Sequence, residues 1–128
     1  MAARTFDMAQ ALQKEMVIIA GKFDGNAGSD PVATTRVGPG WSVARTGTGT
    51  YRVTLTDKYN GLLCAQATIQ QDTPSGRACV IAGVNLANRT IDFQVYDLAT
   101  PTAQNLATTE ELNFLLILTN TSSVPVRG

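Results

Sequence analysis

The sequence predicts a mostly β protein, an antiparallel β-sandwich of jelly-roll-like type with a short N-terminal helix or arm. Apolar and polar residues alternate with a period of two in several short runs. Turn-forming residues separate these runs at intervals of about 8–12 residues, which is typical of a sandwich or barrel. The chain of 128 residues is long enough for one domain with a substantial core. We therefore divide it into an arm (1–15), a β-sandwich domain (16–119) and a C-terminal tail (120–128).

The N-terminal segment has the spacing of a short helix. Apolar residues recur three or four positions apart, at Phe6, Ala9, Leu12 and Met16. Thr5 or Asp7 would cap this helix. A lone helix of this length is marginal in water, so it must pack on its own domain or on a neighbour. We expect it to contact another chain.

The first half of the domain predicts a strand, a loop and a hairpin. Met16–Ala20 is apolar on both faces and ends at Gly21, and a loop rich in turn residues covers 24–31. A short strand is predicted over Val32–Val37. Two alternating runs, 41–45 and 51–56, flank a turn at 47–49 and predict a hairpin. Its core-facing residues are predicted to be Tyr51, Val53 and Leu55.

The second half predicts further strands of the same kind. The residues that share a face in each run are Leu63, Ala65, Ala67 and Ile69, then Ala78, Val80, Ala82 and Val84, then Ile91, Phe93 and Val95. Small inward residues (Ala65, Ala67, Ala78 and Ala82) would let two sheets approach closely. A polar stretch over 98–111 has no clear period. The last strand, 112–118, is apolar on both sides, so either it is buried centrally or one face needs a partner.

Composition narrows the classes of function. Charged residues make up only 16 % of the chain against 44 % hydrophobic, which excludes a disordered protein. Ten basic residues balance ten acidic ones, so the sequence offers no basic surface for nucleic acid. No stretch approaches the ~20 apolar residues of a transmembrane helix. The first residues have no apolar signal region, and we expect synthesis in a cytoplasm without membrane association.

The side chains that catalysis and metal binding usually need are missing. Histidine is absent, which removes the commonest general base and zinc ligand. Cys64 and Cys79 lack metal-ligand spacing and are expected to be free thiols, with a bridge between adjacent strands as the alternative. Glu110 and Glu111 are interpreted as part of a solvated loop, and 24–31 as a plain turn rather than a calcium loop. We therefore expect no enzyme activity, no cofactor and no metal.

Binding to other chains is the remaining class of function. The candidate partner contacts come from the amphipathic arm, from the two strands that are apolar on both faces, and from Trp41: Phe6, Leu12, Met16, Ile18, Trp41, Leu115 and Ile117. Trp41 follows Gly38-Pro39-Gly40 and has two interpretations. It is either a platform for a sugar or partner, or a side chain that packs in the core.

The run Trp41-Ser42-Val43-Ala44-Arg45-Thr46-Gly47-Thr48-Gly49-Thr50-Tyr51-Arg52-Val53-Thr54-Leu55, preceded by the strand 16–23, resembles small virion structural proteins of tailed bacteriophages. The shared pattern is a hairpin of the form (F/W)SVxRTGxGxYxVT after a GxF strand. The 65–69 strand and the final apolar strand followed by Asn-Thr-Ser-Ser are also similar. The resemblance covers roughly residues 8–122 and supplies no catalytic residue.

The resemblance implies a function in the virion. Proteins of this type are commonly capsid decoration (cement) proteins, so the expected partners are the major capsid protein and further copies of this chain, as a homotrimer on the capsid surface. A trimer would match the three-fold axes of an icosahedral shell. The alternative is a receptor- or glycan-binding module of a phage head or tail fibre.

Overall fold

The computed structural model describes residues 16–71 and 76–119, so the predicted helix at 6–15 and the tail at 120–128 lie outside the described residues. The described part contains seven strands and one short 3-10 helix, η1. Their bounds are β1 (Met16–Asp24), η1 (Ala33–Thr35), β2 (Trp41–Gly47), β3 (Thr50–Leu55), β4 (Gly61–Gln70), β5 (Arg77–Asn85), β6 (Thr90–Asp97) and β7 (Glu111–Thr119).

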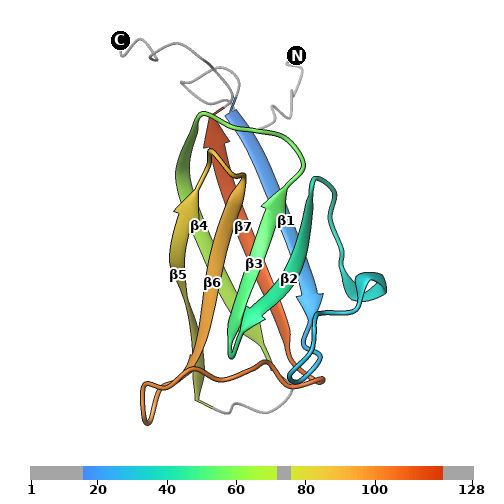
Figure 1. Ribbon diagram of the computed structural model, residues 1–128, viewed down its shortest axis with the longest axis vertical. Helices are drawn as coiled ribbons and strands as arrows, with labels where there is room; N and C mark the ends of the chain where they lie inside the picture. The colour runs from blue at the N-terminus through green and yellow to red at the C-terminus, as the bar shows by residue number, and fades with distance from the viewer. Residues whose placement is uncertain (1–15, 72–75, 120–128) are drawn as a thin grey trace, which may run out of the picture.

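The strands form two antiparallel sheets, which confirms the predicted β-sandwich. Sheet A has the order β1-β7-β4 and sheet B the order β2-β3-β6-β5. In Figure 1 the two sheets lie face to face, with β1 and β2 along one side of the sandwich and β4 and β5 along the other. The chain changes sheet after β1, β3, β4 and β6, so most turns cross between layers at the two ends.

The core lies between the sheets and follows from the alternation in the sequence. The predicted inward residues of β3 and β6 are all buried: Tyr51, Val53, Leu55, Ile91, Phe93 and Val95. They face Leu112, Phe114, Leu116 and Leu118 of β7 across the sandwich. Each such side chain contributes about 1.5–3 kcal/mol through removal from water, so these two faces supply most of the stability.

Aromatic rings pack against one another in one part of this core. Trp41 is 3 % exposed and meets Phe114 edge-on at 4.8 Å between ring centroids and Phe23 at 6.1 Å. Gly21 makes this packing possible, because a Cβ at that position would lie 2.4 Å from the indole ring. The core-packing interpretation of Trp41 therefore holds, and its side chain is not available as a surface platform.

Two strand predictions in the first half of the chain need correction. The first strand continues past Gly21 to Asp24, since its inward positions Ile19 and Phe23 keep the period of two. Val32–Val37 is not a strand. It contains the 3-10 turn at Ala33–Thr35, and only Val37 makes a β-bridge, to Lys22.

Some residues of β4 and β5 also lie on the opposite face from the one predicted. In β4 the ladder shifts between Leu62 and Cys64, so Leu62 packs against the core while Leu63 is 50 % exposed. In β5 the inward residues are Cys79 and Ile81. Val80 and Ala82 are exposed instead. Ala65 and Ala67 face the core as predicted.

Candidate partner-binding surface

The outer face of sheet A is apolar over the half that ends at Thr119. Inward residues of β1 and β7 alternate with outward Ile18, Ala20, Leu115 and Ile117. The register places Ile18 beside Ile117, and Ile117 beside Cys64 of β4. Ile18 is 56 % exposed. We call these five residues (Ile18, Ala20, Cys64, Leu115 and Ile117) the outer patch.

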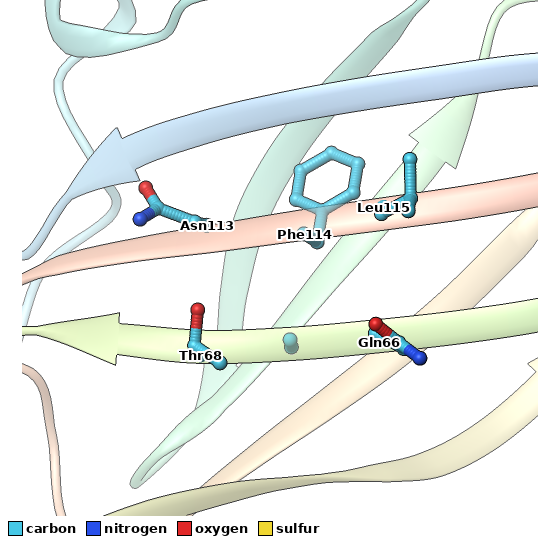
Figure 2. Close-up of a pocket in the computed structure, with 6 residues that line it drawn as sticks. Gln66, Thr68, Asn113, Phe114 and Leu115 are labelled. Carbon is cyan, nitrogen blue, oxygen red and sulfur yellow. The ribbon is translucent and has the colours of Figure 1, made fainter.

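The other half of the same face is polar. Lys22 Nζ lies 3.5 Å from Glu111 Oε2, and Asn113 Nδ2 lies 3.4 Å from Gln70 Oε1. A shallow depression between β4 and β7 has six lining residues: Gln66, Ala67, Thr68, Asn113, Phe114 and Leu115. Figure 2 shows Gln66 and Thr68 of β4 beside Asn113 and Leu115 of β7. The lining side chains of this depression include two amides and one hydroxyl.

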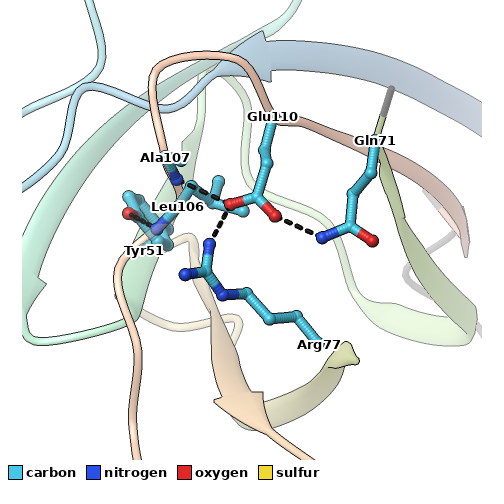
Figure 3. Close-up of polar contacts among 6 residues, drawn as sticks. All are labelled: Tyr51, Gln71, Arg77, Leu106, Ala107 and Glu110. Atoms are coloured by element: carbon cyan, nitrogen blue, oxygen red, sulfur yellow. Dashed lines mark hydrogen bonds and ion pairs between the residues drawn. The ribbon is translucent and has the colours of Figure 1, made fainter. Parts of the chain in front are cut away.

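A buried polar cluster holds the long loop between β6 and β7. Gln71 Nε2 and Arg77 Nη1 donate to the Glu110 carboxylate, and the backbone N–H of Ala107 donates to Glu110 Oε1 at 2.6 Å. Figure 3 shows these groups converging on Glu110 from the residue that follows β4, from β5 and from the loop itself. Glu110 is buried, so its interpretation as part of a solvated loop is wrong.

The charge state of Glu110 follows from these contacts. Burial alone would raise the pKa of its carboxyl, but the bonds from Ala107 and Gln71 and the charge of Arg77 outweigh burial, so the pKa lies below its ordinary value. All the donors around it favour the ionised form. The group is held as a structural anion, which is the opposite of what a general acid needs.

The same loop is fixed at two further points. The backbone N–H of Leu106 donates to the buried hydroxyl of Tyr51 at 2.9 Å. Asn105 Oδ1 accepts from Arg45 Nε at 2.9 Å and from the N–H of Gly49 at 2.8 Å. The loop is therefore an ordered part of the sandwich end.

The structure brings three of the predicted contact residues together. Ile18, Leu115 and Ile117 lie in the outer patch, and Met16 is the partly buried first residue of β1. Trp41 lies in the core, and Phe6 and Leu12 lie outside the described residues. Cys64 and Ala20 complete the patch without having been selected from the sequence. The alternation in this strand puts Cys64 on the other face of the sheet from Ala65, and this was the signal that could have identified Cys64.

Chemically reactive groups are few among the described residues. Cys64 and Cys79 are free thiols, and burial raises the pKa of Cys79 to about 12, which makes it a poor nucleophile. No group of three or more acidic or cysteine residues in the described ranges could hold a metal ion. Within the same ranges, no helix is long and apolar enough to cross a membrane. No family model, curated protein or solved structure matches the chain.

Proposed function

We propose that this chain is a capsid decoration (cement) protein of a tailed bacteriophage, which binds the capsid surface and stabilises it without catalytic turnover. The observation that supports this most is the outer patch, an apolar surface on sheet A in which Ile18 is more than half exposed. Exposed apolar areas of this kind are typical of protein–protein contact sites. The similarity of residues 41–55 to small phage virion proteins supplies the expected partner, the major capsid protein.

Self-association and the finer fold type belong to the same proposal. A trimer would suit a three-fold lattice axis, whereas a dimer would suit a two-fold axis. A jelly roll has eight strands. The described residues contain seven, so this fold type requires an eighth outside them. The helix over 6–15 stays a prediction from its apolar spacing.

The glycan-binding alternative loses its main support. It relied on Trp41 or tyrosine rings as a platform on which a sugar would stack. Trp41, Tyr51 and Tyr59 are all buried in the core, which leaves Tyr96 as the tyrosine with partial exposure. We therefore do not propose this alternative.

Capsids stripped of accessory proteins and mixed with the purified chain provide the test. A ligand that binds only the assembled shell adds about 2.7 kcal/mol at a hundredfold excess over Kd, so the temperature of capsid disruption should rise. The variant Ile117→Asp places a charge in the outer patch and should abolish the rise. Val80→Asp, on the outward face of β5 in sheet B, is the matched control and should retain it. No rise with saturating wild-type protein would refute the proposal.

A further inference from the structure

We infer that β1 pairs antiparallel with β1 of a second copy of this chain, joining two copies of sheet A edge to edge. This goes beyond the proposed function and needs no capsid. The starting observation is the position of β1 at the edge of sheet A. On its inner side it pairs with β7 along its whole length. On its outer side, the only described β contact is the bridge from Lys22 to Val37.

The Lys22 bridge reveals which backbone groups point to the open edge. Lys22 N donates to Val37 O at 3.1 Å, and Val37 N donates to Lys22 O at 2.9 Å, so the peptide groups of Lys22 point away from β7. In an antiparallel ladder this direction alternates from residue to residue. Ile18 and Ala20 lie four and two positions before Lys22, so their N–H groups also point away from β7, toward the open edge. No backbone hydrogen bond within the described ranges meets them there.

This edge lacks the features that normally prevent strand pairing. Proteins protect an edge with charges, proline or a β-bulge. The stretch from Met16 to Gly21 has no charge and no proline, and its ladder with β7 has no register shift. The other three edge strands, β2, β4 and β5, each have a shift. The Met16–Gly21 part of the β1 edge is thus both uncharged and free of a register shift.

A register centred on Ile18 satisfies both the backbone and the side chains. It places Ile18 opposite Ile18 of the second copy and Val17 opposite Ile19. Outward residues then meet outward residues, and core-facing residues meet core-facing residues. A register shifted by one residue would instead place an outward-facing residue opposite a core-facing residue. Each Ile18 would both donate to and accept from the other, as in a hydrogen-bonded antiparallel pair.

The segment around Gly38 limits how far this pairing extends. A Cβ on Gly38 would lie 2.4 Å from the carbonyl oxygen of Ala20, so this segment closes the edge from Ala20 onward. The open stretch is therefore Met16–Ile19, which contains the Ile18 pair and the Val17–Ile19 pairs of the register centred on Ile18. The resulting contact is isologous and two-fold, so it gives a dimer in place of the expected trimer. It also joins the two outer patches into one apolar surface.

Light scattering on the full chain tests the inference. The wild-type protein should have twice the 13.6 kDa mass of one chain at micromolar concentration. Ile18→Pro removes the outward N–H, and proline is tolerated where an edge-strand N–H faces solvent, so this variant should fold and lose the dimer. Ile18→Thr keeps the N–H and the β-branch, and it should remain dimeric.

Amide hydrogen exchange gives a second readout that needs no variant. Exchange at Ile18 should slow as the wild-type concentration rises, whereas the Lys22 amide, bonded to Val37, should be protected at every concentration. A wild-type monomer or trimer, or exchange at Ile18 that is independent of concentration, would overturn the inference. A monomer that still raises the capsid disruption temperature would leave the proposed function standing.

Discussion

Glu110 and Glu111 are neighbours in sequence but have opposite environments. The carboxylate of Glu110 is buried and held by Arg77, Gln71 and Ala107, whereas Glu111 pairs with Lys22 on the surface of sheet A. An exposed pair contributes little, because water and salt screen it. A buried carboxylate that loses its charge loses its ion pair with Arg77 and part of its capacity to accept hydrogen bonds.

Glu110→Gln should therefore lower the free energy of unfolding by about 1.5–3 kcal/mol, whereas Glu111→Gln should change it by less than about 1 kcal/mol. The pKa of Glu110 is depressed in the fold, so its contribution is present above the ordinary carboxyl pKa and is lost as pH falls through the folded value. Urea unfolding at pH 7 and across the acid range measures both effects. Equal losses for the two variants at pH 7 would contradict this explanation.

Gly49 illustrates a backbone requirement at the β2–β3 turn. Its φ is +71°, and a Cβ there would lie 2.6 Å from the carbonyl oxygens of Gln104 and Val95. Gly76 has a similar φ of +67° but no described atom within 4 Å of its Cβ position. A comparison of substitutions at the two glycines therefore separates the cost of backbone strain from the cost of a steric clash.

Gly76→Ala should cost about 1–2 kcal/mol for the left-handed conformation alone. Gly49→Ala should cost more, by about a further 1–3 kcal/mol, because the loop from Gln104 to Asn105 must move. Thermal unfolding of both variants checks the difference. If the unfolding temperatures of the two variants fall by the same amount, the close approach at Gly49 does not contribute to stability.

At the scale of elements, β7 has two apolar faces in different environments. Leu116 is buried between the sheets, and its neighbour Leu115 is in the outer patch. Leu116→Ala should destabilise the fold by about 2–5 kcal/mol through the cavity it leaves. Leu115→Ala should cost less than about 1 kcal/mol in unfolding and should weaken capsid binding instead. Urea unfolding of the two variants measures the contribution of each face to stability, and co-sedimentation with capsids measures its contribution to binding.

The alternating pattern was sufficient to predict most strands but not every register. Strict alternation in β3 and β6 identified their buried residues correctly, because each inward position holds a large apolar side chain. In β5 both parities are apolar, so the pattern could not distinguish Cys79 and Ile81 from Val80 and Ala82. The shifts beside Leu62 and Ile81 depend on cross-strand partners distant in sequence. The same holds for Glu110, whose partners are Gln71, directly after β4, and Arg77, the first residue of β5.

At the scale of the whole molecule, the charge balance decides how binding should respond to salt. Ten basic and ten acidic residues give no net charge, and the outer patch contains none of them. Several charges are already engaged within the chain, as in the pairs Arg52–Asp92 and Arg77–Glu110. Long-range attraction to a capsid would therefore be weak, and apolar contact would supply most of the affinity.

Capsid binding should accordingly change little between low and moderate salt. Interactions between exposed charges are screened over about 10 Å at 0.1 M ionic strength, so a charge-driven contact would weaken steeply across this range. Apolar burial is not weakened by screening, and each capsid-bound copy would retain its affinity. Co-sedimentation with stripped capsids over a salt series, with the disruption temperature measured in parallel, gives the comparison. A steep loss of binding with salt would be compatible with the proposed decoration function, but it would indicate that charged residues outside the outer patch make the contact.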